Sequence, residues 1–220
     1  MSGEVNPKYT LTLASSLPSN LPPPIDDGAC DHLPGLALPS IPLPTAGDPS
    51  TKIDVSTLPG LVLIFVYPRS AAPGEVIPPE WDAIPGARGC TPQACSYRDK
   101  AARLAGAGVA HLFGVSAQTA EVQREFRERE HLPYELLSDA GLEMARGLGL
   151  PTFEYGGARL LKRITMAVEG GRVVRVWYPV FPADRNVQEV LEWLEGRGVR
   201  GRFVVTLVWA QKLSNVEGAP

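Results

Sequence analysis

The stretch GLVLIFVYP, residues 60–68, decides the fold of this 220-residue chain. It is a continuous apolar and β-branched run between Gly60 and Pro68, which is typical of a strand buried on both faces of a sheet. VAHLFGVS, residues 109–116, is a second run of the same kind. Parallel strands of this type need helical crossovers, so the two runs predict an α/β domain around a central sheet.

Helical patterns and a hairpin alternate with these strands. Residues 91–108 predict a helix, with Thr91 as its N-cap, Pro92 at its first position and glycines at its end. The further predicted elements are a charged helix carrying Val122 and Phe126, a short strand in YELLSD (134–139), a short helix in AGLEMARGLG (140–149), a hairpin that turns at residues 169–171, and an amphipathic helix in NVQEVLEWLEGRG (186–198) with Val187, Val190, Leu191 and Leu194 inward. The order predicts a thioredoxin-like fold, with a central mixed β-sheet flanked by helices.

Segments of a different composition flank this domain. Residues 18–49 carry nine prolines, which exclude a helix and a central strand. We expect an extended arm on the domain, with edge pairing near residues 36–43, or disorder in its first part. RFVVTLVWAQ, residues 202–211, predicts an extra C-terminal strand that extends the sheet or pairs between subunits. The predicted divisions are a proline-rich arm (1–55), a thioredoxin-like domain (56–198) and a C-terminal extension (199–220).

Composition narrows the class of function. The net charge is −3 and the basic residues are spread along the chain, which argues against nucleic acid as a partner. The longest apolar run is far shorter than the roughly 20 residues that a membrane-spanning helix needs, and the N-terminus lacks a secretory pattern. Three cysteines are too few for a disulfide scaffold. We therefore expect a cytoplasmic protein with no membrane partner.

Two of the cysteines, Cys90 and Cys95, lie in GARGCTPQAC at residues 86–95. A free cysteine is most often a packing residue, but this pair lies at a polar junction between a loop and a helix. A metal site is disfavoured because there is no second clustered pair of ligands; the remaining candidates are Cys30, His32, His111 and His131. Redox chemistry is favoured, since the free N–H groups at a helix start stabilise a thiolate.

The spacing of the pair sets a structural condition on such chemistry. In an intact helix five residues rise about 7.5 Å and turn about 500°, so the two side chains point away from each other. A disulfide needs Cα atoms roughly 4.4–6.8 Å apart. A bond between Cys90 and Cys95 therefore requires local unwinding of the helix start. Arg88 and Arg98 add positive potential nearby.

Several motifs in consistent order, from about Leu58 to Leu194, resemble those of peroxiredoxins of the bacterioferritin-comigratory-protein (Q) type. GCTPQACSYRD, residues 89–99, resembles the family signature G-C-T-x-x-A-C-x-F-R-D, and YP precedes it at the end of the first strand. The stretch from FGVS to LLSD (113–139) and KRITMAVEGGRVVRVWY (162–178) resemble a second family stretch and its arginine-bearing hairpin.

The resemblance implies a thiol-dependent peroxidase without a cofactor. Cys90 is then the peroxidatic cysteine, Cys95 the resolving cysteine and Arg163 the active-site arginine, while Pro68 shields the site. A peroxide oxidises Cys90 to a sulfenic acid, Cys95 condenses with it, and a thioredoxin- or glutaredoxin-like reductant reduces the disulfide. Both a monomer and a dimer remain open.

The sequence departs from the family pattern beside Cys90. Ala87 stands where the family has a threonine, and the insertion RSAAPGEVIPPEWDAIPGARG (69–89) separates Pro68 from Cys90. We expect Trp81 to fix the insertion to the domain, and Ser70, Thr91 or a main-chain group to replace the missing hydroxyl.

Two other functions remain open at this point. One is a thiol–disulfide oxidoreductase that acts on protein substrates, which the four-residue spacer between the cysteines and Arg163 both disfavour. The other is a redox-inactive interaction module on a thioredoxin-like fold, in which the arm and the insertion form the binding surface.

Overall fold

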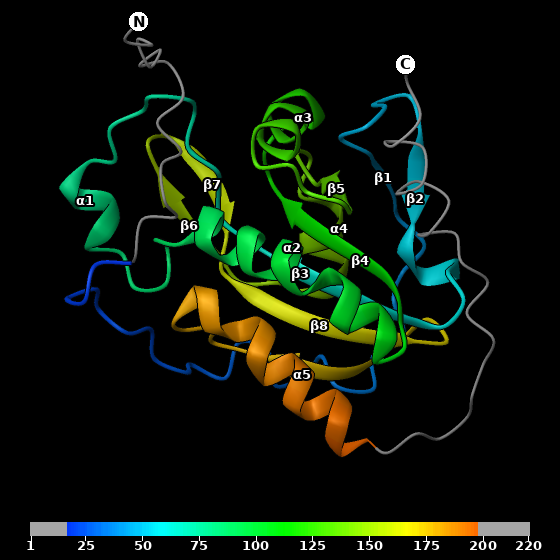
Figure 1. The fold of residues 1–220 in the computed structure, drawn as a ribbon. Coiled ribbons are helices and arrows are strands. Elements are labelled where there is room, and N and C mark those ends of the chain that lie inside the picture. The colour runs from blue at the N-terminus through cyan, green and yellow to red at the C-terminus, as the bar shows by residue number, and fades with distance from the viewer. Residues whose placement is uncertain (1–16, 198–220) are drawn as a thin grey trace, which may run out of the picture.

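The strand expected from GLVLIFVYP is at the centre of a five-stranded sheet. A computed structural model describes residues 17–197, and in it the strand order is β5-β4-β3-β8-β9. β4 and β5 run parallel on one side of β3, whereas β8 and β9 follow as an antiparallel pair on the other side. The bounds are β3 Leu61–Val66, β4 Val109–Ser116, β5 Glu135–Ser138, β8 Ile164–Glu169 and β9 Arg172–Trp177. The predicted central mixed sheet is confirmed (Figure 1).

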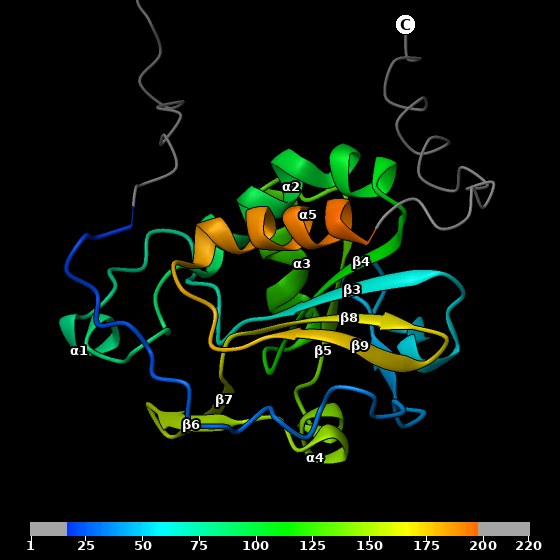
Figure 2. The same cartoon turned by 90° about the horizontal axis from the view of Figure 1, so that it is seen from below.

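Helices cover both faces of this sheet (Figure 2). On one face lie α2 (Cys90–Gly106), α3 (Ala120–Arg129) and α5 (Asn186–Gly196); α4 (Glu143–Leu148) lies on the other. The four apolar residues expected to point inward from α5 are all buried. The thioredoxin-like fold is confirmed, and no helix within residues 17–197 is both long and apolar enough to cross a bilayer.

The side chains of β3 alternate between two hydrophobic cores. Leu61, Leu63 and Phe65 belong to the first core, which lies against α2, α3 and α5. The residues between them belong to the second core, which lies against α4. Every residue of β3 is buried, which confirms a strand enclosed on both faces. Phe65 stacks on Tyr97 of α2, with ring centroids 4.7 Å apart. The first core therefore fixes α2 directly over the centre of the sheet.

The proline-rich arm completes the second core. Its side chains Cys30, Leu33 and Leu43 are buried against the sheet, where the short helix α4 alone leaves apolar surface to cover. Figure 2 shows the arm, in blue, running past α4. The Val173 N–H donates to the Leu36 carbonyl over 2.9 Å, and the Leu38 N–H donates to Gly171 over 2.8 Å. The expected extended arm with edge pairing is confirmed.

An ion pair fixes an earlier part of the arm. Lys162 Nζ lies 2.8 Å from Asp27 Oδ2, and the Tyr178 hydroxyl donates to Asp27 Oδ1 over 2.8 Å. These bonds lower the pKa of the Asp27 carboxyl to about 2, with the Lys162 bond as the largest cause. The arm is thus attached next to Arg163, the residue that follows Lys162.

The start of α2 differs from the sequence prediction. Thr91 is not the N-cap: the cap is Gly89, whose φ of 108° lies in the left-handed region that favours glycine. The first bond of the helix runs from the Gln93 N–H to the Gly89 carbonyl, over 2.9 Å. Because Gly89 takes this conformation, the helix begins at Cys90 and Thr91 lies inside its first turn.

Several elements were not expected from the sequence. They are the hairpin of β6 (Thr152–Tyr155) and β7 (Ala158–Leu161), the pair β1 (Pro42–Pro44) and β2 (Lys52–Asp54), the helix α1 (Pro79–Asp82) in the insertion, and 3₁₀ turns at Val55–Thr57 and Ala183–Arg185. The prediction that α3 carries Val122 and Phe126 as its apolar residues is wrong for Val122, which is 42% exposed. The residue of α3 that is buried together with Phe126 is Gln123. The strand expected at residues 202–211 lies outside the described residues.

We expect Gly114→Ala to destabilise the fold, because β4 passes very close to its neighbours there. A Cβ atom on Gly114 would lie 2.6 Å from Leu136 Cδ2 and 2.7 Å from Phe65 Cζ. Overpacking of this kind costs about 1–3 kcal/mol in unfolding free energy, measured by urea denaturation. The control is Gly106→Ala at the end of α2, where a Cβ meets nothing within 4 Å. Equal midpoints for the two variants would contradict this packing.

Candidate active site

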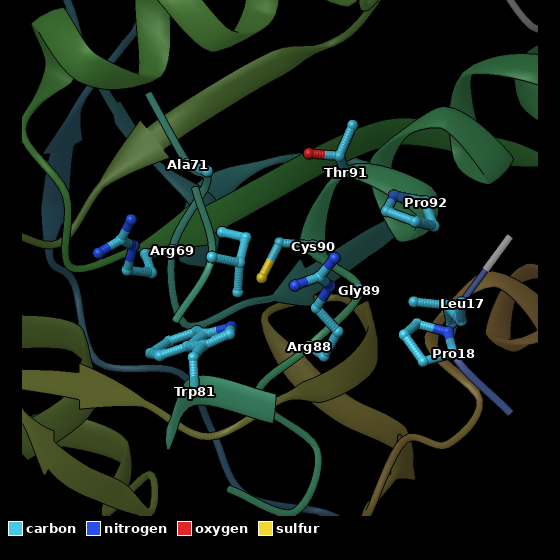
Figure 3. A pocket seen from close by; sticks show the side chains of 11 residues that line it. Leu17, Pro18, Arg69, Ala71, Trp81, Arg88, Gly89, Cys90, Thr91 and Pro92 are labelled. Carbon is cyan, nitrogen blue, oxygen red and sulfur yellow. The ribbon is translucent and has the colours of Figure 1, made fainter. Parts of the chain in front are cut away.

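Cys90 is the first residue of α2 and lies at the bottom of a pocket of about 200 Å³. Its side chain is only 6% exposed. Figure 3 shows the sulfur pointing into the pocket, with Arg69 and Trp81 on one side and Leu17 and Pro18 on the other. The insertion and the arm therefore form most of the walls of the pocket that opens to this thiol.

The guanidinium of Arg163 touches the sulfur from inside the protein. Arg163 Nη2 donates to Cys90 Sγ over 3.2 Å, and the arginine is only 3% exposed. The same side chain donates to three carbonyls of the loop before Cys90: to Gly86 over 3.2 Å, to Ala87 over 2.9 Å and to Arg88 over 3.3 Å. A positive charge is thus fixed beside the thiol by the backbone of the loop that carries it.

A buried polar network holds Arg163 from the opposite side. Arg163 Nη1 donates to Gln93 Oε1, and Gln93 Nε2 lies 3.5 Å from Asn186 Oδ1. Asn186 Oδ1 also accepts from the Tyr97 hydroxyl over 2.7 Å and from the Thr165 hydroxyl over 2.6 Å. Sequence reasoning missed Gln93 and Asn186. The only signal for Gln93 was its place between the two cysteines, and Asn186 looked like an ordinary first residue of a helix.

The Cys90 thiol contacts the main chain of Ala87, the residue that stands at the position of the family threonine. The Cys90 thiol donates to the Ala87 carbonyl over 3.6 Å. Ser70 is directed elsewhere, since its N–H and hydroxyl both bond to Gln118 Oε1, at 2.7 and 3.1 Å. Thr91 lines the pocket, and its side chain has no hydrogen bond among residues 17–197. Of the three expected replacements, the main-chain group is the one that contacts the thiol.

Pro68 does not line the Cys90 pocket. It lines a second, smaller cavity together with Pro24, Lys162 and Arg163, and that cavity does not include Cys90. The structure therefore places Pro68 against the arginine rather than against the sulfur.

Cys95 is buried away from Cys90 on the same unbroken helix. Its sulfur lies 3.5 Å from Glu130 Oε2, just after the end of α3, and its side chain is 7% exposed. Burial raises the pKa of the Cys95 thiol to about 11; Glu130 adds to the rise, whereas Arg98 opposes it. All three cysteines are free thiols, so the structure shows the reduced state.

The insertion is fixed to the domain through Trp81, as expected. The indole is 4% exposed and packs edge-on against Tyr155, with ring centroids 4.9 Å apart, and against Phe153 at 6.0 Å. Both partners belong to β6. The guanidinium of Arg69 lies 5.5 Å from the indole centroid. The β6–β7 hairpin, which the sequence did not predict, is thus the support of the pocket wall.

The remaining candidates for metal binding lie apart from one another. Cys30 packs in the second core, where burial raises its pKa to about 12, and the His32 ring bonds to the Leu148 carbonyl over 2.8 Å. His111 lies in β4 beside Phe113. Among residues 17–197 there is no group of three or more His, Cys, Asp or Glu side chains that could hold a metal ion.

Comparison with known proteins gives one family. The model of the redoxin family matches residues 33–192, more than half of the chain. The chain is 30% identical over 135 residues to chloroplastic peroxiredoxin Q of Suaeda salsa, an alignment that covers 61% of this chain and 55% of the relative. It is 30% identical over 129 residues to peroxiredoxin bcp1 of Schizosaccharomyces pombe, with coverage of 58% and 56%. The chain spans little more than half the length of these relatives.

Solved structures resemble it over more of their length. Peroxidoxin BcpB from Mycobacterium tuberculosis superposes with a TM-score of 0.61 and 26% identity, over 77% of this chain and 100% of the other. Peroxiredoxin Q from Xanthomonas campestris has a TM-score of 0.58 at 21% identity, over 73% and 96%, and shows the shared fold.

We expect Glu130→Gln to lower the pKa of Cys95, because it removes the carboxylate that opposes ionisation of the thiol. In a Cys90→Ser background, alkylation of Cys95 by iodoacetamide at pH 8–10 should become roughly threefold faster or more. The matched control is Glu128→Gln on an exposed position of the same helix. Alkylation profiles that coincide for Glu130→Gln and the parent protein would show that Glu130 does not act on Cys95.

Proposed function

The chain belongs to the redoxin family, and from that premise we propose that it is a thiol-dependent peroxidase. Its substrates are hydrogen peroxide or organic hydroperoxides, and it works in a reducing cytoplasm. The predicted likeness to Q-type peroxiredoxins is confirmed by the relatives that bear this name. The single observation that carries the proposal is the contact of 3.2 Å between Arg163 Nη2 and Cys90 Sγ at the bottom of a pocket.

In the first step the Cys90 thiolate attacks one oxygen of the peroxide. An S–O bond forms, the O–O bond breaks, and the leaving oxygen departs with the bonding electron pair. It takes up a proton and becomes water or an alcohol, while Cys90 becomes a sulfenic acid. Sulfur is oxidised by two electrons and the peroxide is reduced by two.

Stabilisation of the leaving oxygen is the main requirement of this step. An ordinary thiol, with a pKa of about 8.5, is a few per cent ionised at neutral pH, so full ionisation increases the rate only about 30-fold. A fixed donor that binds a developing oxyanion typically contributes 10²–10³. Arg163 is the fixed cation closest to the reacting sulfur, because Gln93 and three loop carbonyls hold its guanidinium in place before the peroxide arrives.

In the second step Cys95 resolves the sulfenic acid. The Cys95 sulfur attacks the Cys90 sulfur, an S–S bond forms, and the hydroxyl group leaves as water. Because α2 is continuous from Cys90 through Cys95, its first turns must unwind and Cys95 must leave Glu130. A thioredoxin- or glutaredoxin-like dithiol then reduces the disulfide.

The burial of Cys90 supports a peroxide over a protein as the oxidant. A thiol that is 6% exposed at the bottom of a pocket of about 200 Å³ admits a small molecule. A protein disulfide would have to reach the sulfur past the insertion and the arm. This favours the peroxidase over the thiol–disulfide oxidoreductase.

We expect Cys90→Ser to abolish peroxide consumption in a coupled assay with thioredoxin, thioredoxin reductase and NADPH. Cys95→Ser should still consume one equivalent of peroxide but should fail to turn over with thioredoxin. Arg163→Lys should lower the rate of Cys90 oxidation by roughly 10²-fold, because lysine is a single point of positive charge without the planar donor set. Full peroxidase activity in Cys90→Ser would refute the proposal.

We also expect oxidation to unwind the start of α2. Hydrogen exchange of the amides from Gln93 to Tyr97 should become at least about tenfold faster after one equivalent of peroxide, since their helical bonds break when the disulfide forms. Amides of α5 should keep their protection and serve as the internal control. Unchanged exchange in a protein whose Cys90–Cys95 bond is verified by mass spectrometry would contradict the unwinding.

A further inference from the structure

The walls of the Cys90 pocket come mainly from two segments that lie outside the family motifs. Ile77 and Trp81 belong to the insertion at residues 69–89, and Leu17 and Pro18 belong to the arm. In Figure 3 the Trp81 indole stands on the side of the pocket toward which the Cys90 sulfur points. The surface that a substrate meets before it reaches the sulfur is therefore formed mainly by segments outside the motifs shared with the family.

The pocket is larger than hydrogen peroxide requires. A cavity of about 10–15 Å³, measured in the same way as this pocket, holds one water molecule, and hydrogen peroxide adds only one oxygen atom to it. The pocket measures about 200 Å³. The pocket has room for a hydroperoxide with a compact hydrocarbon group and its –OOH on the sulfur, whereas hydrogen peroxide would leave the apolar wall without a partner.

The two arginines that line the pocket are each paired with a carboxylate of the insertion. Arg69 is paired with Glu75, and Arg88 Nη1 lies 3.0 Å from Asp82 Oδ1. Neither guanidinium is left as a free cation for an anionic substrate. The apolar side chains and the paired charges together favour a hydroperoxide without a net charge.

The aromatic wall is built before the substrate arrives. Trp81 is held edge-on by Tyr155 at 4.9 Å and contacted by Arg69 at 5.5 Å, so its indole is fixed in one orientation. A rigid apolar surface binds a hydrocarbon group without first having to be ordered. Contact between a hydrocarbon group and a fixed indole is sufficient to change the relative kcat/KM of a bulky and a small peroxide.

We propose that the insertion makes this site selective for uncharged organic hydroperoxides, and that Trp81 is the residue that determines this specificity. The inference deepens the proposed peroxidase function and rests on it. The reaction is unchanged: the O–O bond breaks, and the leaving oxygen carries the alkyl group and takes up a proton to become an alcohol instead of water. What changes is the relative kcat/KM of the two kinds of peroxide.

The test compares cumene hydroperoxide with hydrogen peroxide by stopped-flow measurement of Cys90 oxidation. We expect the wild-type ratio of kcat/KM, cumene hydroperoxide over hydrogen peroxide, to fall about tenfold in Trp81→Ala. Ile77→Ala should also lower the ratio, whereas Trp81→Phe should keep most of the wild-type ratio. Val76→Ala is the matched control, because Val76 lies in the same insertion and is 87% exposed.

The outcomes separate this inference from the proposed function. A ratio that stays the same in Trp81→Ala and Ile77→Ala overturns the specificity role and leaves the peroxidase intact. A wild-type protein that oxidises with neither peroxide overturns the peroxidase. A second measurement does not depend on turnover. It follows the binding of the product alcohol, 2-phenylpropan-2-ol, to the Cys90→Ser variant through the NMR signals of the indole N–H groups. Binding that Trp81→Ala does not weaken counts against the inference on its own.

Discussion

The bonds of Arg163 are the constraint on which the rest of the site depends. A cation that is 3% exposed must be compensated inside the protein, and here the compensation comes from neutral acceptors rather than a carboxylate. Three consecutive loop carbonyls and Gln93 accept its N–H groups, and one nitrogen also reaches the Cys90 sulfur. The arginine therefore shapes the loop before α2 and supplies charge to the thiol with the same side chain. A change in the loop is also a change in the environment of the sulfur.

The two steps of the proposed cycle make opposite demands on the start of α2. Peroxide attack needs the loop, Arg163 and Cys90 in a fixed arrangement, whereas disulfide formation needs the first turns to unwind. Packing favours the fixed state. A Cβ on Gly89 would lie 3.1 Å from Leu17 of the arm, and a Cβ on Gly86 would lie 3.4 Å from Pro24, so the arm rests against the loop that has to move. The arm thus packs against this loop as well as covering the second core.

The sequence allowed the framework to be predicted, because its signals are local. The continuous apolar run of β3, the glycine that ends α5 and the two-residue turn between β8 and β9 are each specified by neighbours in the chain. Gln123 was missed for the opposite reason: it is buried because the Tyr67 hydroxyl and the Leu137 carbonyl, both distant in sequence, satisfy its amide. The β6–β7 hairpin did have a local signal, since Gly156 and Gly157 both take positive φ at its tip. Asn186 had none, because its role depends on Gln93, Tyr97 and Thr165 meeting in space.

At the position of the family threonine, the Ala87 carbonyl takes part in two hydrogen bonds. In the reduced thiol this oxygen accepts both the Cys90 S–H and an Arg163 N–H. When Cys90 ionises, the S–H bond disappears, and a buried carbonyl without another donor would then be left unsatisfied at a cost of about 1–3 kcal/mol. Arg163 keeps the Ala87 carbonyl satisfied, because the bond of 2.9 Å from its Nη2 to that oxygen remains. The bond from the same nitrogen to the Cys90 sulfur becomes a charge-assisted bond to the thiolate. Arg163 Nη2 therefore donates both to the sulfur and to the carbonyl beside it, and at this site the arginine is the hydrogen-bond donor to Cys90.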